Sequence, residues 1–237
     1  MIKDYVAFDL ETTGLSPETD QIIEIGALKV KDGKVVERFM EFVKPDNPIS
    51  PIITNITGIT NEMVADARDT GEIIRDFVNF CEDYVLVGHN IMFDYKFSKI
   101  YANKYGYCFE KKGIDTLKLA RTIHKDLESK SLCVLCEYYK IENKAAHRAY
   151  HDALATAKLY QCMAHYHEAK NEKLFVPVQL MYKEKKVQPI TKKQMEYIRV
   201  LCEYHSLCPE KCLEDMTRSE ASKFIDSIIS EHGLIKY

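Results

Sequence analysis

The chain has 237 residues, of which 46% are hydrophobic and 29% are charged, with only 9 glycines and 7 prolines. This composition is typical of a globular domain and excludes collagen-like sequence and long disordered tracts. Lys and Arg number 33 against 36 Asp and Glu, a formal net charge of −3, so the chain as a whole is not a polycation that would coat nucleic acid. No apolar run approaches the roughly 20 residues of a bilayer crossing. The N-terminus lacks a signal-peptide pattern, so we expect a cytoplasmic protein.

The first part of the chain predicts three strands. Residues 5–10 form a short apolar run interrupted only by Asp9, which is typical of a buried strand. Two further β-rich runs, 21–30 and 34–44, are joined by a Lys-Asp-Gly sequence at 31–33. Asp-Gly is a strong hairpin signal, so this region predicts a three-stranded meander.

Helical spacing then alternates with short strands. Apolar residues recur at helical intervals over 71–83, and a strand-like run over 84–87 ends at Gly88. Strands followed by alternating strands and helices indicate an α/β fold, in which a mixed sheet has helices packed on its faces. The remaining expected elements are helices over 93–104, 116–124, 131–140 and 149–168 and a strand at 113–115.

The pattern changes near residue 169. Basic residues outnumber acidic ones from 168 to 199, and two prolines interrupt any helix there, which predicts a basic linker over 169–189. Beyond it, a Thr-x-x-Gln and a Thr-x-x-Glu sequence match helix-opening capping boxes. We therefore expect an N-terminal domain over 1–168 and a small helical module over 190–237. This module is either a docking appendage for nucleic acid or a partner, or a small domain that only packs.

Eight cysteines without an export signal predict reduced thiols. Four potential zinc ligands lie close together in the C-terminal module at irregular spacing: Cys202, His205, Cys208 and Cys212. The sequence leaves two interpretations open, a structural zinc site or an amphipathic helix that buries Cys202 in an apolar core.

Four carboxylates stand out. Asp9 and Glu11 lie two apart on the first predicted strand, so both side chains project from the same face. Carboxylates this close repel each other unless a cation binds between them, and a hard divalent ion is the economical candidate. Asp94 follows a strand end, and Asp152 opens a helix five residues after His147. These residues are distant in sequence but lie at element ends that can converge.

Three segments carry these residues: FDLETTGL at 8–15, GHNIMFD at 88–94 and HRAYHDA at 147–153. In order, spacing and residue type they resemble the three exonuclease motifs of the DEDD family, and more narrowly of its histidine subgroup. That subgroup includes the proofreading exonucleases of bacterial replicative DNA polymerases, such as DNA polymerase III, and some RNA-trimming enzymes. The resemblance implies a ribonuclease-H-like fold and a 3′→5′ exonuclease that releases nucleoside monophosphates.

The same resemblance implies a site for two divalent cations, Mg²⁺ or Mn²⁺. By motif, Asp9 bridges both ions, Glu11 and Asp152 hold the ion that activates water, and Asp94 supports the other ion through water. Two ions about 3.5–4 Å apart stabilise both the attacking and the leaving oxygen at phosphorus. All-oxygen octahedral sites suit both metals.

His147 is the general base that the resemblance implies. An imidazole removes a proton from metal-bound water near neutral pH. His151 is a competing candidate because it adjoins Asp152. The family pattern places the base five residues before the last aspartate, which selects His147.

The resemblance also implies contacts to the substrate. In the turn after the first strand, Thr12, Thr13 and the backbone amides would contact the terminal nucleotide. Gly14 would allow the close approach of the backbone, and Leu15 would offer an apolar surface to the last base.

For four further residues the resemblance implies roles that are less specific. Thr57 falls in a segment that lines the nucleotide pocket in the family, although some relatives have His there. His89 and Asn90 would position phosphate or fix the strand end. Asp115 resembles a frequent family aspartate, but a helix N-cap is the better interpretation.

Three functions compete at this stage. The leading hypothesis is an exonuclease that acts on single-stranded or frayed DNA 3′ ends, with a polymerase or another replication protein as a possible partner and no membrane. The second is an exoribonuclease, because sensing of the 2′-hydroxyl depends on pocket contacts that motif spacing does not fix. The third, a non-catalytic nucleic-acid-binding module, predicts eroded metal ligands, whereas all four carboxylates and His147 are present.

Overall fold

The computed structural model describes residues 1–143, 147–183, 188–209 and 211–235. The chain divides into two compact units, Met1–Tyr182 and Lys183–Tyr237. Each unit has its own core and is described by itself.

The first unit is built on a mixed six-stranded sheet with the order β3-β2-β1-β4-β5-β6. The first three strands form the expected antiparallel meander, whereas β1, β4 and β5 run parallel and β6 pairs antiparallel with β5. The strands are β1 (Tyr5–Thr12), β2 (Ile22–Lys31), β3 (Lys34–Phe42), β4 (Val85–Gly88), β5 (Lys112–Asp115) and β6 (Val178–Gln179).

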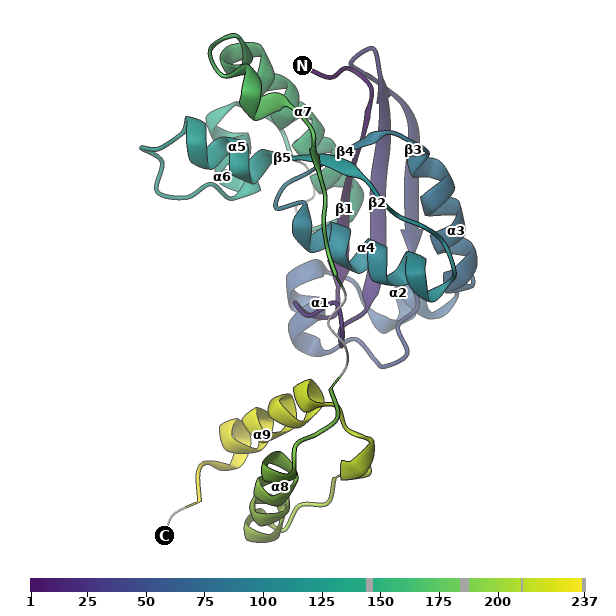
Figure 1. The fold of residues 1–237 in the computed structure, drawn as a ribbon, viewed down its shortest axis with the longest axis vertical. Coiled ribbons are helices and arrows are strands. Elements are labelled where there is room, and N and C mark those ends of the chain that lie inside the picture. The colour runs from purple at the N-terminus through teal and green to yellow at the C-terminus, as the bar shows by residue number, and fades with distance from the viewer. Residues whose placement is uncertain (144–146, 184–187, 210, 236–237) are drawn as a thin grey trace. The chain divides into compact units, whose positions relative to one another are not determined.

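Helices flank this sheet (Figure 1). They are α1 (Pro51–Thr57), α2 (Asn61–Ala65), α3 (Thr70–Cys81), α4 (Met92–Lys104), α5 (Thr116–Ile123), α6 (Leu132–Tyr138) and α7 (Ala149–His167). The five from α3 onward confirm the expected helices. The sequence pattern gave no sign of α1 and α2, because helices of 7 and 5 residues are too short for periodicity to stand out. Among the described residues, no helix combines the length and apolar character that a membrane crossing requires.

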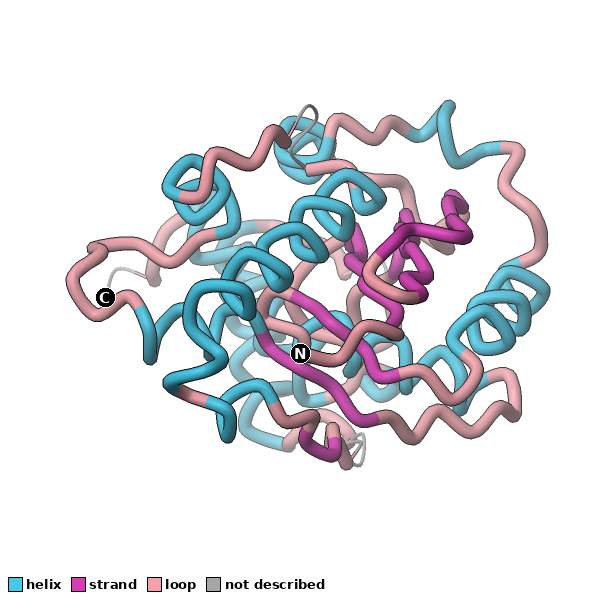
Figure 2. Tube along the Cα trace, turned by 90° about the horizontal axis from the view of Figure 1, so that it is seen from above, coloured by secondary structure: helices cyan, strands magenta, loops and turns pink. Residues whose placement is uncertain are grey.

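The two faces of the sheet carry separate cores because alternate residues of β1 point to opposite sides. Phe8 and Leu10 pack on one side with buried residues of α3 and α4, and Tyr5 and Ala7 pack on the other side with α7. Figure 2 shows the strands of this unit lying among the helices. Asp9 continues the Tyr5–Ala7 series and therefore lies on the α7 side of the sheet.

The segment expected as a linker, 169–189, is ordered against the first unit as far as Tyr182. Short 3₁₀ turns, η1 (Glu168–Lys170) and η2 (Glu172–Phe175), lead into β6. Phe175 and Leu180 are each 3% exposed. Phe175 belongs to the core on the α7 side of the sheet, and Leu180 belongs to the core on the α3 and α4 side. These buried apolar side chains attach the segment to the first unit, so the division between the units lies at 182/183 instead of at 168. The prediction of a linker rested on the basic residues and overlooked the apolar ones. Residues 184–187 of the expected linker lie outside the described residues.

The second unit pairs α8 (Lys192–His205) with α9 (Arg218–His232), and a 3₁₀ turn, η3 (Leu213–Asp215), lies between them. Both expected capping boxes are present: the Thr191 and Thr217 hydroxyls accept the amides of Gln194 and Glu220, whose side chains return to the threonine amides. Its core consists of Ile190, Ile198, Leu201, Cys202, Met216, Ala221 and Ile228.

Candidate active site

The C-terminal half of β1 has one open edge, and α4 fills it. β4 pairs with β1 only from Tyr5 to Ala7, so the next main-chain donors on that side need another acceptor. The Leu10 N–H donates to Oδ1 of Asp94 at 3.0 Å. Asp94 is 3% exposed, and this bond holds its carboxylate beside the strand that carries Asp9 and Glu11.

α7 reaches the same place from the other side of the sheet because β2 has no side chain at Gly26. Gly26 lies opposite Asp9 in the β1–β2 pair. A Cβ atom at Gly26 would lie 2.0 Å from the backbone nitrogen of Tyr150, so any other residue would push the helix away. The start of α7 therefore approaches the sheet where β1 carries its carboxylates, and Asp152 lies in the first turn of that helix.

Glu11, His147 and Asp152 offer ligand atoms that all lie within 4.8 Å of one another. His147 adopts a left-handed backbone conformation with φ 64°, which is uncommon for a residue other than glycine. Its N–H donates to Oδ2 of Asp152 at 2.9 Å. His147 is exposed, and Glu11 and Asp152 are half-buried, so the cluster is open to solvent on the histidine side. His151 lies outside this group, within the first turn of α7.

The carboxylates strongly perturb one another. Burial, followed by repulsion from Asp94, Glu11 and Asp152, raises the pKa of Asp9 well above its ordinary value. The pKa of Asp94 is also raised, first by burial, although its bond from Leu10 opposes the shift. For Glu11, burial and the charge of Asp152 raise the pKa to about 8. Such a cluster favours a bound cation, because a cation offsets both the lost hydration and the repulsion.

The donor set fits a hard divalent cation. Four carboxyl groups supply the oxygen ligands that Mg²⁺ and Mn²⁺ prefer, and the His147 imidazole adjoins two of them, Glu11 and Asp152. Two features make the site suitable for such a cation: its ligand atoms are carboxylate oxygens, and the carboxylates repel one another when no cation is bound.

The turn after β1 is closed by its own threonines. The Thr12 hydroxyl donates to the Gly14 carbonyl at 2.6 Å, and the Thr13 hydroxyl accepts the Gln21 amide at 2.8 Å. A Cβ at Gly14 would lie 2.4 Å from the Asp20 carboxylate, which accepts the Ser16 amide, so a larger residue here would displace that side chain. Leu15 projects into solvent with 84% of its surface exposed.

Other expected substrate contacts have partners within the protein. Thr57 is buried, and its hydroxyl donates to the Ile53 carbonyl at 3.0 Å. Both ring nitrogens of His89 are engaged, one with the Thr116 hydroxyl and one with the Lys130 carbonyl, each at 2.9 Å. These contacts tie the end of β4 to α5 and to the loop before α6.

Asp115 confirms the N-cap interpretation. Its carboxylate accepts the Leu117 amide at 3.0 Å and the Lys118 amide at 3.4 Å, at the start of α5. It also accepts the amide of Asn90 at 3.0 Å. Asn90 has φ 66°, so Asp115 fixes the turn that follows β4, while the Asn90 side chain faces solvent.

The sequence analysis assigned no role to three residues near the site: Asn143, Glu24 and Arg148. Asn143 donates from its side chain to Oδ1 of Asp152 at 2.6 Å, and Glu24 on β2 pairs with Arg148 at 2.7 Å. Glu24 had a detectable signal, because a single carboxylate in the apolar run from 22 to 28 requires a buried partner. Asn143 had none, since its contact depends on how the chain turns before α7.

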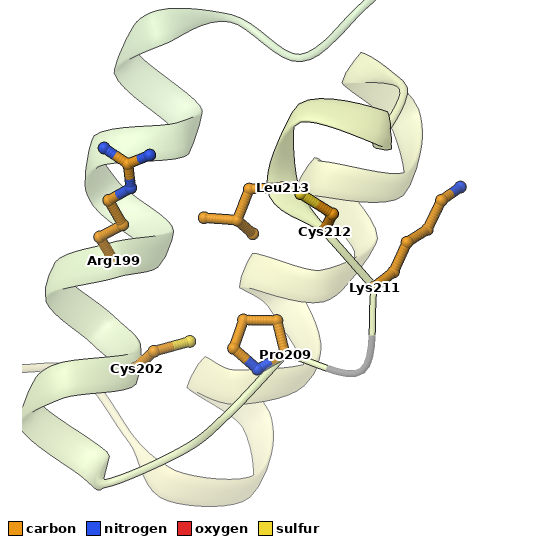
Figure 3. A pocket seen from close by; sticks show the side chains of 6 residues that line it. All are labelled: Arg199, Cys202, Pro209, Lys211, Cys212 and Leu213. Carbon is orange, nitrogen blue, oxygen red and sulfur yellow. The ribbon is translucent and has the colours of Figure 1, made fainter.

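The cysteines of the second unit do not gather into a metal site. Within the described ranges, the one group of metal-capable side chains that meets the 4.8 Å distance is the one at Glu11. Cys202 is buried in the core of the unit, as the apolar interpretation expected. His205 contacts the Gly233 carbonyl at 3.2 Å. Figure 3 shows the thiols of Cys202 and Cys212 on different segments around a surface pocket.

A mixed sheet of this order, with acidic side chains at the C-terminal end of its central strand, defines the class of ribonuclease-H-like nucleases. The particular family follows from comparison with known sequences. Residues 6–160 match the exonuclease family RNase_T, and the chain belongs to it. This confirms the expectation of a DEDD-family exonuclease.

Among curated relatives, the PolC-type DNA polymerase III of Caldanaerobacter subterraneus is 45% identical over 157 residues, which cover 66% of this chain and 11% of that protein. The chain thus spans about a tenth of the length of this relative.

Solved structures agree with the family. Exonuclease X in complex with 5′ overhanging duplex DNA is 28% identical with a TM-score of 0.58, and the match covers 72% of this chain and 96% of that one. Exonuclease I, at 19% identity and a TM-score of 0.63, shares the fold over 73% of this chain and 42% of its own.

Proposed function

We propose that the protein removes nucleoside monophosphates from DNA 3′ ends by hydrolysis with two divalent cations, Mg²⁺ or Mn²⁺. One observation carries the proposal: elements far apart in sequence bring Asp9, Glu11 and Asp94 together with Asp152 and His147 at the end of β1. Phosphodiester hydrolysis is the reaction that such a carboxylate cluster with an adjoining imidazole suits, because charge develops on oxygen at both sides of phosphorus.

The residues that would hold the cations are Asp9, Glu11, Asp94 and Asp152. When bound, the cations supply positive charge that stabilises the attacking and leaving oxygens. The protein keeps these ligands in place: Leu10 fixes Asp94, and Asn143 together with the His147 backbone fixes Asp152. Asp94 and Asp152 are therefore oriented before substrate arrives.

His147 is the proposed general base. Its ring lies in the same 4.8 Å group as Glu11 and Asp152 and faces solvent, from which both water and substrate enter. An imidazole takes a proton from the attacking water at neutral pH, and this assistance is typically worth about 10²–10⁴-fold in rate. The water oxygen then forms the new bond to phosphorus as the bond to the 3′ oxygen of the next nucleotide breaks.

The turn at 12–15 is the proposed seat of the terminal nucleotide. The exposed Leu15 offers its apolar surface to the last base, and the exposed Asn90 remains a candidate for a phosphate contact. Thr12, Thr13 and Thr57 act through the shape of the backbone, because their hydroxyls bond within the protein. His89 acts likewise, through its two internal bonds.

Similarity to PolC-type polymerases supports DNA as the substrate and a replicative polymerase in the cytoplasm as the partner. The bound DNA named for exonuclease X supports the same substrate class. In such a setting the substrate would be a frayed 3′ end, because a mispaired terminus unstacks at little cost and can enter a single-strand site.

The test is digestion of three substrates of one sequence: single-stranded DNA, duplex DNA with a mispaired 3′ end, and single-stranded RNA. We expect stepwise release of 5′-monophosphates from both DNA substrates in Mg²⁺ or Mn²⁺ and none in EDTA, with Asp152→Asn as the inactive control. Faster removal from RNA would make the enzyme an exoribonuclease. Binding of DNA without any release by the wild type would indicate a non-catalytic module.

A further inference from the structure

Glu24 is an unusual residue for the centre of a sheet. It is 4% exposed in a strand that is otherwise apolar up to Leu28. It lies directly opposite Glu11 in the β1–β2 pair, so the two carboxylates share a face of the sheet and are close neighbours. Two like charges in this position destabilise the sheet unless a third group compensates them.

Arg148 supplies that compensation. Its Nε lies 3.1 Å and its Nη2 2.7 Å from Oε1 of Glu24, and the same guanidinium stacks 5.4 Å from the centre of the Phe42 ring. Phe42 is the β3 neighbour of Glu24, so the arginine lies across β2 and β3. The charge of Arg148 also lowers the pKa of Glu11, against the opposing effects of Asp152 and Glu24.

Glu24 also supports the first turn of α7. Arg148 is the N-cap residue of this helix, and its side chain makes no capping hydrogen bond. The amide of Ala149, which the N-cap side chain leaves without a partner, donates instead to Oε2 of Glu24 at 3.1 Å. A residue of the sheet thus satisfies one of the donors that a helix start leaves unpaired.

These contacts act on the two residues that α7 contributes to the site. Arg148 directly follows His147, which has φ 64° and donates its amide to Asp152. Asp152 lies one turn further into the helix that Glu24 caps. A shift of the Glu24–Arg148 pair would therefore move the imidazole and the carboxylate together, relative to Glu11 on the strand.

We propose that Glu24 and Arg148 are positioning residues of the active site: their ion pair locks the start of α7 onto β2 and so sets His147 and Asp152 at working distance from Glu11. The inference rests on the proposed metal-dependent hydrolysis. It assigns the pair a role in binding the cation and in turnover, beyond the stability that any buried ion pair affects.

The experiment compares the wild-type 237-residue chain with Arg148→Lys, Arg148→Gln and Glu24→Gln. The matched control is Arg68→Gln, because Arg68 pairs with the carboxylates of Glu41 and Asp76 at an exposed position, and Glu41 lies opposite Ile25, on the face of the sheet that Glu24 does not occupy. Four quantities are measured for each variant: Mn²⁺ affinity by calorimetry without DNA, kcat, KM for single-stranded DNA, and Tm.

We expect Arg148→Gln and Glu24→Gln to weaken Mn²⁺ binding and to lower kcat by about 10–100-fold, the usual cost of losing a group that orients metal ligands. KM should change little, because neither side chain is assigned a contact with DNA. Arg148→Lys should recover part of both losses, since it restores the charge without the two-point contact. Arg68→Gln should match wild type in Mn²⁺ affinity and kcat.

The proposal is overturned if the variants have a lower Tm but the folded protein keeps its Mn²⁺ affinity and kcat. The pair would then serve only the stability of the fold. If Glu24→Gln fails to fold, Arg148→Lys and Arg148→Gln decide the question. A wild type that neither binds Mn²⁺ nor digests DNA would instead overturn the proposed function, a result that this design separates from failure of the pair.

Discussion

The main-chain N–H of Leu10 donates a 3.0 Å hydrogen bond to the carboxylate of Asp94. This bond joins β1 to α4 where β4 has stopped pairing, and it places Asp94 against the strand between Asp9 and Glu11. One carboxylate thus completes the hydrogen bonding of the strand edge and adds charge to the site. Its two roles can be separated by substitution.

We expect Asp94→Asn to fold and to lose turnover, because the amide oxygen still accepts the Leu10 N–H but carries no charge for a cation. In EDTA its Tm should equal or exceed that of wild type, since a repelling charge is gone. Asp94→Ala should lose turnover and also about 1–3 kcal/mol of unfolding free energy, the cost of an unpaired buried donor. Thermal melts with a DNA digestion assay check both. An active Asp94→Asn enzyme would remove Asp94 from the metal ligands.

The pKa of Glu11 predicts how stability depends on pH in metal-free protein. Burial and the Asp152 charge raise this pKa from 4.5 to about 8. The folded state therefore holds a proton that the unfolded chain releases at lower pH. The stabilisation is complete below about 4.5 and is lost as pH rises through about 8.

Melts in EDTA should accordingly show a falling Tm between these pH values, and saturating Mg²⁺ should remove most of the fall by compensating the carboxylates. Glu11→Gln should make the profile in EDTA less steep, because the substituted side chain does not titrate, while the raised pKa values of Asp9 and Asp94 keep part of the slope. A wild-type Tm in EDTA that rises or stays level over this range would contradict the prediction.

His147 is predicted to act as a base, and a measurement can separate this role from metal ligation. His147→Ala should lower kcat by about 10²–10⁴-fold while leaving Mn²⁺ affinity nearly unchanged. His151→Ala should have a mild effect on both, because its side chain lies outside the Glu11 cluster. A large loss of Mn²⁺ affinity in His147→Ala would make this histidine a ligand, and full activity would end its assignment as the base.

The side chain of Asn143 holds Asp152 at 2.6 Å. Removal of this bond in Asn143→Ala frees the carboxylate to rotate, so we expect about 10-fold weaker Mn²⁺ binding and a similar loss in kcat. Asn171→Ala is the control, because the Asn171 amide donates one bond of similar kind, to the His167 carbonyl at the other end of α7. Equal behaviour of the two variants in calorimetry would show that the Asn143 contact does not tune the site.

The C-terminal unit allows a test by truncation. A chain that ends at Tyr182 keeps β6 and the buried Leu180 and Phe175, so we expect the first unit to remain folded. If the helical pair docks nucleic acid, this chain should bind long single strands more weakly and hydrolyse a dinucleotide as fast as wild type. Equal affinity of the two proteins for long strands would leave the unit without a role in DNA binding. Circular dichroism confirms that the truncated chain is folded.

The sequence by itself determined the fold class and the helices from α3 onward, and it predicted the residues of the candidate site. Strand alternation put Asp9 and Glu11 on one face, and the capping boxes fixed the starts of α8 and α9. These features are local, since they depend on backbone periodicity and on side chains within a few residues of their partners. Motif order then identified Asp94, His147 and Asp152 as members of one site.

Only the tertiary structure decided how these residues are held. Asp94 meets the strand because β4 ends early, and α7 approaches because Gly26 leaves room. The Glu24–Arg148 pair joins residues 124 positions apart, and the apolar anchors of 169–182 outweigh its basic composition. Contacts of this kind depend on burial and on which groups lack a partner once the chain is packed. Those conditions exist only in the folded protein.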